Sequence, residues 1–112
     1  MRMWSVNPRV LCNQHLLGEH NEMHMFAGCL RKGVSVQGYV DKGLVHVSQI
    51  RSRHEELVAE MIRRGMRHKS PLPDFLTPIG QTNLVSVEAN LVELRERCEI
   101  CKMLQETGGW IK

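Results

Sequence analysis

Apolar residues recur at intervals of three and four in three separate stretches of this chain. Such spacing places side chains on one face and is typical of amphipathic helices that pack against a core. The first stretch begins at Asn7-Pro8, which has the residue types of a helix start, with asparagine as cap and proline at the first helical position. Gly33 has the residue type that ends a helix, so the pattern predicts a first helix between Pro8 and Gly33.

Two more helices are predicted in the same way. Ser48 is the expected cap of a second helix, which ends at Gly65. Thr82 or Asn83 is the expected cap of a third helix, which Gly108-Gly109 ends. Apolar residues supply the stripe of the second helix (Ile50, Leu57, Val58, Met61, Ile62) and the seam of the third (Val87, Leu91, Leu94, Cys98, Cys101, Leu104).

The connections between these helices differ in character. Residues 34–46 are β-branched and punctuated by glycine, and they predict a linker with a brief extended piece. Three prolines make residues 70–80 an irregular loop. A length of 112 residues fits one domain. We therefore expect an all-α fold: a compact three-helix single domain over residues 1–112, with a long irregular loop before the last helix.

The net charge of +3 is unevenly distributed. Residues 1–70 hold 11 basic and 6 acidic side chains, whereas residues 71–112 hold 4 and 6. A basic first part favours an anionic partner. No apolar run is long enough for a transmembrane helix, and the N-terminus lacks an apolar signal core, so we expect a cytoplasmic protein with no membrane partner.

The segment from Gln14 to His24 concentrates acid/base side chains, namely His15, Glu19, His20, Glu22 and His24. Side chains four residues apart share a helix face, so His15 can converge with Glu19, and His20 with His24. Two such pairs are compatible with a divalent ion and a metal-dependent hydrolase, although the H-E-x-x-H signature is absent. The other interpretation is a set of hydrogen-bonded, partly buried histidines.

Cys98 and Cys101 form a C-x-x-C pair on the predicted third helix. Small apolar side chains three residues apart fit a helix seam, and reduced thiols are expected in a cytosolic protein. A zinc site would need two further ligands, for which Cys12 and Cys29 are the candidates. Core packing is the favoured interpretation, and no metal is predicted.

Four stretches, taken in order, match the pattern of one known family. They are Gln14–Leu17 followed by Glu19 and Glu22, Gly28 with Arg31-Lys32, SRHEELVAEMIRRGMRHK at 52–69, and, more faintly, VEANLVELRERC at 87–98. On these residues the chain resembles the pyrimidine-dimer DNA glycosylase/AP-lyases, the family of phage endonuclease V and its bacterial relatives. The resemblance implies a compact all-α enzyme of DNA repair that acts on pyrimidine dimers or related base lesions in double-stranded DNA.

The resemblance also implies a mechanism. In that family the amine of the first residue attacks C1′ of the damaged nucleotide, the base leaves, a Schiff base forms, and β-elimination cuts the strand. The nucleophile falls on Met1 here and the essential glutamate on Glu22. Because Arg2 is bulky, we expect Met1 to be retained. An α-amine is unprotonated at neutral pH to a larger extent than a lysine side chain, so it suits this role without a cofactor.

The chain departs from the family at Asn21 and Met25, where the family carries arginines that help to grip DNA near the lesion. This departure keeps one alternative open, a non-catalytic DNA-binding module of the same fold. We expect the protein to be a monomer that holds DNA mainly by its phosphates. The residues expected to contact DNA are Arg2, His15, His20, Asn21, Arg31, Lys32, Arg64, Arg67 and Lys69.

Overall fold

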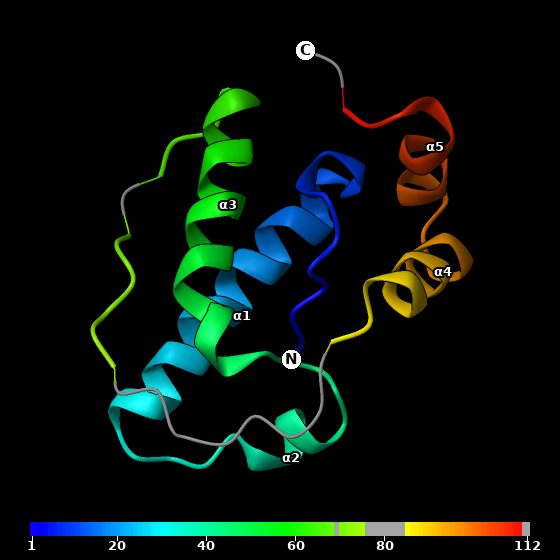
Figure 1. Ribbon diagram of the computed structural model, residues 1–112. Coiled ribbons are helices and arrows are strands. Elements are labelled where there is room, and N and C mark those ends of the chain that lie inside the picture. The colour runs from blue at the N-terminus through cyan, green and yellow to red at the C-terminus, as the bar shows by residue number, and fades with distance from the viewer. Residues whose placement is uncertain (69, 76–84, 111–112) are drawn as a thin grey trace.

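The chain folds into helices joined by loops (Figure 1). A computed structural model describes residues 1–68, 70–75 and 85–110. The all-α prediction is confirmed, since these ranges contain no strand. In chain order the elements are the 3-10 helix η1 (Pro8–Val10), α1 (Asn13–Arg31), α2 (Gln37–Asp41), the 3-10 helix η2 (Val47–Gln49), α3 (Ile50–Arg63), α4 (Val87–Arg97) and α5 (Glu99–Thr107).

The first predicted helix corresponds to α1, but α1 begins later than expected. Asn7 does cap a helical turn, because its side-chain oxygen accepts a hydrogen bond from the Arg9 N–H at 3.0 Å. That turn is only η1, and the backbone becomes extended at Leu11 (φ −90°, ψ 133°). α1 then starts with Cys12 as its cap, whose sulfur accepts a hydrogen bond from the N–H of His15 at 3.4 Å. The chain therefore changes direction between η1 and α1.

The second predicted helix is α3, and it too starts differently. Ser48 does not cap it, because Ser48 lies within η2 and its hydroxyl bonds with the ring Nδ1 of His46 at 2.9 Å. Gln49 holds the cap position without a side-chain hydrogen bond. Residues 34–46 contain the short helix α2 instead of the predicted extended piece. After α3, residues 70–75 contain no regular element, as expected for the loop.

The third predicted helix is divided at Cys98 into α4 and α5. Cys98 has extended backbone angles (φ −142°, ψ 111°), and its sulfur accepts a hydrogen bond from the N–H of Cys101 at 3.4 Å, which starts α5. Ser86 caps α4 through its hydroxyl. The expected caps Thr82 and Asn83 lie outside the described residues.

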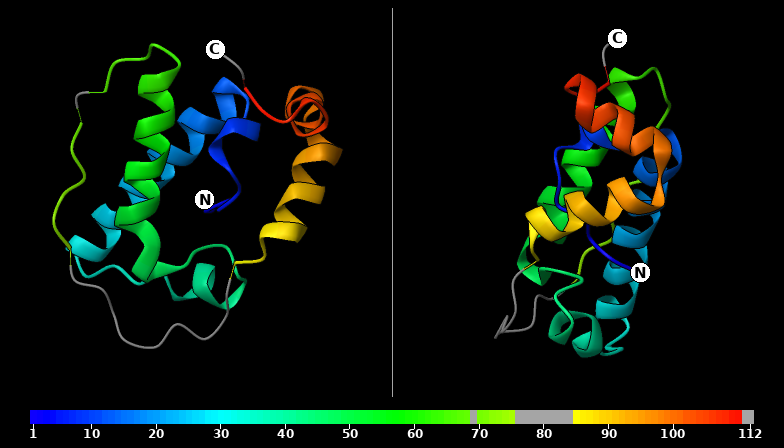
Figure 2. Two further views of the ribbon diagram at one scale, coloured as in Figure 1. Left: turned by 45° about the horizontal axis from the view of Figure 1, so that its top comes forward. Right: turned by 90° about the vertical axis from the view of Figure 1, so that its right-hand side faces the viewer.

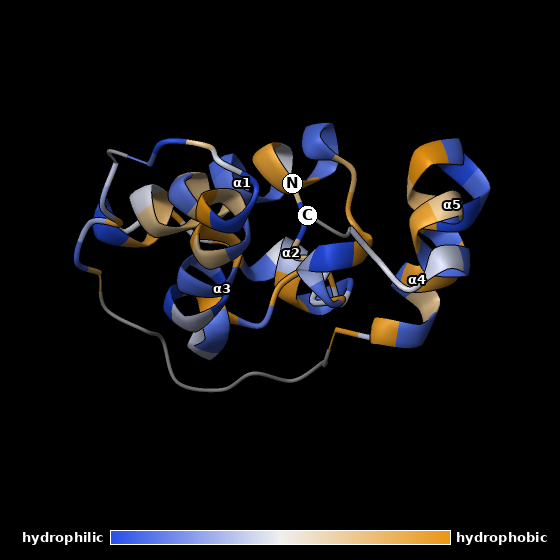
Figure 3. Cartoon of the chain, turned by 90° about the horizontal axis from the view of Figure 1, so that it is seen from above, coloured by the Kyte–Doolittle hydropathy of each residue, from blue (hydrophilic) through white to orange (hydrophobic). Residues whose placement is uncertain are grey.

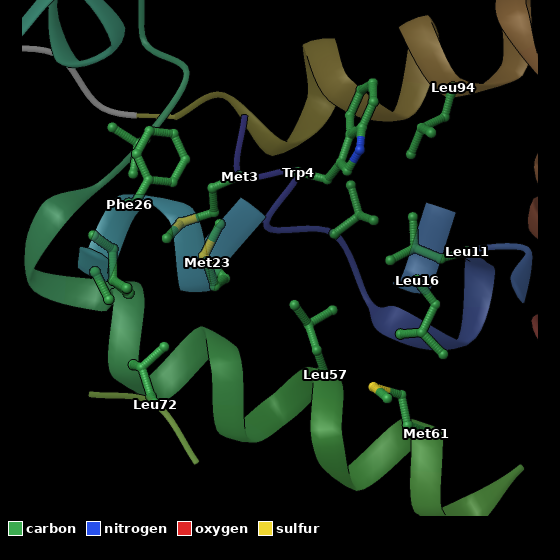
Figure 4. Close-up of a cluster of buried hydrophobic side chains, with 14 of the residues drawn as sticks. Met3, Trp4, Leu11, Leu16, Met23, Phe26, Leu57, Met61, Leu72 and Leu94 are labelled. Atoms are coloured by element: carbon green, nitrogen blue, oxygen red, sulfur yellow. The ribbon is translucent and has the colours of Figure 1, made fainter. Parts of the chain in front are cut away.

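The core lies between α1 and α3 and is completed by the N-terminal segment (Figure 4). Both α1 and α3 contain hydrophobic as well as hydrophilic residues (Figure 3). No described helix is both long and apolar enough to cross a membrane. Met3 and Trp4 join the same cluster, with 0% and 4% of their surface exposed. Burial of each large apolar side chain contributes about 1.5–3 kcal/mol. Other members of the cluster are Leu11, Leu16, Met23, Phe26, Leu57, Met61, Leu72 and Leu94.

The N-terminal segment, residues 1–7, lies between α1 and α4 (Figure 2). The N–H of Met3 donates to the carbonyl of Leu44 at 2.6 Å. The side-chain amide of Asn90 on α4 donates to the carbonyl of Trp4 at 2.7 Å. Buried backbone groups need such partners, and a segment without regular structure finds them on its neighbours. The start of the chain is thereby fixed inside the fold.

A buried ion pair ties this segment to α1 and α3. Glu19 is 0% exposed, and its carboxylate accepts two hydrogen bonds from the Arg53 guanidinium, at 2.6 and 2.8 Å. The same carboxylate accepts a bond from the backbone N–H of Trp4 at 3.1 Å. Arg53 also donates to the carbonyl of Val6 at 2.7 Å and to Glu56. The two interior charges are tolerated because they are paired with each other and make further hydrogen bonds with the backbone and with Glu56.

The last described residues return to η1. The N–H of Trp110 donates to the carbonyl of Arg9 at 2.7 Å. Gly109 has a φ of +108°, and a Cβ there would lie 2.9 Å from the Cβ of Arg9, so this approach requires glycine. The C-terminal helices are thus tied to the beginning of the chain at a second place.

We expect Arg53→Met to lower the free energy of unfolding by about 3–5 kcal/mol, because it leaves the Glu19 carboxylate buried without its partner. Urea denaturation followed by circular dichroism measures this change. The control is Arg51→Met on the same helix, whose ion pair with Asp74 is largely exposed, and we expect it to change stability by less than about 1 kcal/mol. Equal effects of the two substitutions would contradict the role assigned to the buried pair.

Candidate active site

The α-amine of Met1 lies beside the carboxylate of Glu22. The terminal nitrogen is 3.7 Å from Glu22 Oε1, and the backbone N–H of Arg2 donates to the same oxygen at 3.1 Å. The side chains of Met1 and Glu22 are 14% and 26% exposed, so solvent reaches this position. The structure therefore brings together the two residues that the sequence analysis assigned to catalysis, in a place that is neither fully buried nor fully open.

The surroundings of Glu22 change its affinity for protons. Burial raises the pKa of Glu22, and the backbone N–H of Arg2 and the terminal ammonium oppose part of this increase. The neighbouring Glu19 carboxylate adds to the increase. A carboxylate with a raised pKa is a stronger base than an ordinary glutamate. Such a base next to an amine can accept the proton that the amine loses when it acts as a nucleophile.

The side chain of Arg2 is held against α4. Its guanidinium donates to Glu93 Oε2 at 2.5 Å and to Asn90 Oδ1 at 2.7 Å, and it lies 4.1 Å from the ring centroid of Trp4. The predicted contact of Arg2 with DNA would require it to exchange these partners. In the structure its contacts hold the backbone of the first two residues at Glu22.

The four residues of the hydrolase alternative do not form one cluster. Glu19 is engaged in the buried pair with Arg53. His15 lies with three cysteines, and His20 and His24 lie with two other histidines. The pairing of His15 with Glu19 that the four-residue spacing suggested is therefore absent, because the two side chains have different buried partners.

His15 belongs to a group with Cys12, Cys98 and Cys101. Its Nδ1 lies 3.1 Å from Cys12 Sγ and 3.5 Å from Cys101 Sγ, and Cys98 Sγ is 3.9 Å from Cys12 Sγ. All four cysteines are free thiols, and Cys29 does not belong to the group. Burial raises the pKa of Cys101 to about 12 and lowers the pKa of His15. Cys101 is fully buried, as expected if the C-x-x-C pair packs in the core. Core packing alone does not explain why three sulfur atoms and an imidazole nitrogen lie so close together.

A second group joins His20 and His24 on α1 with His54 on α3 and His68 after α3. The Nε2 atoms of His24 and His54 are 3.1 Å apart. Burial, together with the three neighbouring imidazoles, lowers the pKa of His20 to about 4. The four-residue spacing on α1 predicted the His20–His24 pair but not the other two histidines, since no local spacing relates them to it. His20 is only 6% exposed, so its predicted contact with DNA is not available in this conformation.

The basic residues predicted to contact DNA lie in different environments. Arg64 has a side chain that is 1% exposed and donates to the carbonyls of Pro8 and Leu11 at 3.0 and 2.7 Å. It supports the turn before α1, so its predicted phosphate contact is corrected. Lys69 lies outside the described residues. The exposed candidates are Asn21, Arg31, Lys32 and Arg67.

Comparison with known proteins identifies one family. The family model described as pyrimidine dimer DNA glycosylase matches residues 1–74. The matched region contains Met1, Glu22 and the elements from η1 to α3, whereas α4 and α5 lie beyond it. No curated protein and no solved structure matches the chain.

Proposed function

The chain belongs to the pyrimidine dimer DNA glycosylase family, and we propose that it removes damaged pyrimidines from duplex DNA and then cuts the strand, with the Met1 amine as nucleophile and Glu22 as proton acceptor. The observation that carries this proposal is the distance of 3.7 Å between the Met1 nitrogen and Glu22 Oε1. An amine at such a distance from a base with a raised pKa can be deprotonated and remain in place to attack.

In the first step the lone pair of the Met1 nitrogen attacks C1′ of the damaged nucleotide. The glycosidic bond breaks, and its electron pair leaves with the base, which takes up a proton. Glu22 accepts the proton that the amine loses. Before it accepts this proton, the negatively charged carboxylate would also stabilise positive charge that develops on the sugar, because the amine that attacks C1′ lies 3.7 Å from it.

In the second step the sugar ring opens at the C1′–O4′ bond, O4′ takes up the proton that Glu22 accepted, and the nitrogen and C1′ are joined as a protonated Schiff base. The Glu22 carboxylate, 3.7 Å from the amine, then accepts a proton from C2′. The electron pair released from C2′ expels the 3′ phosphate, and the strand is cut. Hydrolysis of the Schiff base would return the free amine. No step requires an oxidant or a further reactant besides water.

The exposed cations at the end of α1 would supply affinity for the DNA backbone. Arg31 and Lys32 are exposed at the C-terminal end of α1, and Arg67 is exposed after α3. Contacts of such residues with phosphates give affinity with little sequence preference. A lesion-directed enzyme must act in any sequence, so this form of binding suits the proposed substrate.

We expect Glu22→Gln to reduce strand cleavage by about 10²–10⁴-fold, because the amide cannot accept the proton from the amine. DNA affinity should stay near normal. Cleavage of a duplex with one pyrimidine dimer and of a duplex with one abasic site, together with a binding titration, measures both properties.

The control is Glu96→Gln, the same substitution at an exposed position of α4, which should cleave like the unmodified protein. Cleavage unaffected by Glu22→Gln would refute the role of Glu22. DNA binding by the unmodified protein without cleavage of either duplex would favour the alternative of a non-catalytic DNA-binding module.

We expect Arg31→Ala to weaken binding to all duplexes alike and to reduce the slope of log affinity against log salt by about 1, as the loss of one phosphate contact does. Lys102→Ala is the control, since α5 lies at the opposite side of the molecule from the C-terminal end of α1 (Figure 1). Fluorescence anisotropy at several salt concentrations provides the slopes. An unchanged slope for Arg31→Ala would remove this residue from the DNA-binding surface.

A further inference from the structure

We propose that Cys12, His15, Cys98 and Cys101 form a structural zinc site. The four residues come from two short motifs, C-x-x-H and C-x-x-C, and each motif occupies the cap and first turn of a helix, α1 or α5. Paired motifs of this spacing are the arrangement in which proteins present cysteine and histidine to zinc. The sequence suggested Cys12 as a possible partner of Cys98 and Cys101, but no local spacing indicated that His15 lies with them.

The distances within the group fit a tetrahedral zinc ion. With Zn–S near 2.3 Å and Zn–N near 2.0–2.1 Å, the ligand atoms of such a site lie about 3.4–3.8 Å apart. Cys98 Sγ and Cys12 Sγ are 3.9 Å apart, and His15 Nδ1 is 3.1 and 3.5 Å from Cys12 Sγ and Cys101 Sγ. All four ligand atoms lie within 4.8 Å of one another. Small movements would therefore place all four at bonding distance from a single ion.

Backbone N–H groups are arranged to support thiolates at this position. Cys12 Sγ accepts from the N–H of His15 at 3.4 Å, and Cys98 Sγ accepts from the N–H of Cys101 at 3.4 Å. Cys101 Sγ accepts from the N–H of Cys12 at 3.3 Å. The positive ends of the α1 and α5 dipoles also meet here. These features favour the deprotonated sulfur that binds zinc, and at Cys101 the N–H of Cys12 opposes the effect of burial, which raises the pKa of that thiol.

The proposed site would be structural, because four protein ligands leave no position open for a substrate. It joins the start of α1, inside the region that matches the family, to α5, which lies outside that region. Helix α4 precedes α5 directly, and its Asn90 and Glu93 hold the Arg2 side chain. A zinc ion would thus fix the C-terminal helices against the segment that carries Met1.

Cobalt substitution tests the site without changing the chain. We expect Co²⁺ added to the metal-free protein to give a tetrahedral spectrum with sulfur-to-cobalt charge-transfer bands, which excess Zn²⁺ abolishes. Zinc should also protect Cys12, Cys98 and Cys101 from alkylation, mapped by mass spectrometry, while Cys29 continues to react. The absence of the charge-transfer bands, or equal alkylation with and without zinc, would overturn the proposal.

Substitutions provide a second test. Cys98→Ser, at a partly exposed position, should lose the cobalt charge-transfer spectrum of the wild type and bind one equivalent of zinc less. Cys29→Ser is the control and should keep both properties, because Cys29 lies outside the group. Unchanged zinc content in a folded Cys98→Ser protein would contradict the proposal. The alkylation map of the wild type decides the question if that variant does not fold.

A separate observation supports a second metal site, and we infer that His20, His24, His54 and His68 bind a divalent transition metal ion. Their ligand nitrogens lie within 4.8 Å of one another, with 3.1 Å between the Nε2 atoms of His24 and His54. The Nε2 atoms of His20 and His68 are buried and have no hydrogen-bond partner among the described residues. Buried ring nitrogens without a partner are costly unless a ligand satisfies them, and a metal ion would satisfy both.

The surroundings of this histidine group also suit a metal. Imidazole is a preferred ligand of Zn²⁺, Cu²⁺ and Ni²⁺. His54 Nδ1 lies 2.9 Å from a carboxylate oxygen of Glu55, the kind of contact that orients a metal-bound histidine. His68 follows α3, so a metal here would hold the segment after α3 against α1.

Metal content distinguishes this site from the cysteine site. We expect the wild type to bind two equivalents of zinc and His24→Gln to bind one, while its cobalt charge-transfer bands are retained. His46→Gln, a histidine outside both groups, should keep two equivalents. Zinc should also shift the ring signals of the four histidines in the NMR spectrum of the wild type. Saturation at one equivalent with the ring signals unchanged would overturn the second site, and so would unchanged zinc content in His24→Gln.

Discussion

The buried carboxylate of Glu19 is the contact on which the candidate site depends. It binds Arg53 on α3 and the backbone N–H of Trp4, so it joins the two long helices and the N-terminal segment at one point. Three residues further along α1, Glu22 then meets the start of the chain. The two glutamates lie on one face of α1. Glu19 is buried and holds the structure together, whereas Glu22 is partly exposed and can react with a substrate. The position of the amine is therefore a consequence of the buried ion pair between Glu19 and Arg53.

The C-terminal helices extend this arrangement on the other side of the N-terminal segment. Asn90 of α4 binds both the Trp4 carbonyl and the Arg2 guanidinium, so α4 restrains the segment opposite to α1. The proposed zinc ion would in turn restrain α5 and α4 relative to the start of α1. Helices α4 and α5, which lie outside the residues matched by the family model, would therefore help α1 and α3 to hold Met1 beside Glu22.

The sequence predicted the helical class, the three regions of helix and the Met1–Glu22 pair, the last by resemblance. Periodicity located these helices because apolar faces are local patterns. It missed the interruptions at Leu11 and Cys98, where sulfur caps of the following helices replace the usual oxygen caps. It also misassigned Arg64, since burial by the turn before α1 is a property of tertiary structure. The sequence named Cys12 as a possible zinc ligand beside Cys98 and Cys101, although core packing was the favoured interpretation, and it paired His20 with His24. It did not place His15 with the cysteines, or His54 and His68 with the other histidines, because each group combines residues from separate elements.

Reductive trapping with a free and with a blocked N-terminus shows whether the Met1 amine is the nucleophile. A duplex with one abasic site is mixed with the protein and borohydride, once with the free Met1 amine and once after Nα-acetylation, with circular dichroism to show that both forms are folded. We expect a covalent adduct that mass spectrometry maps to Met1 in the free form, and no adduct in the acetylated form. An adduct of equal yield in both forms, or one that maps to a lysine, would contradict it.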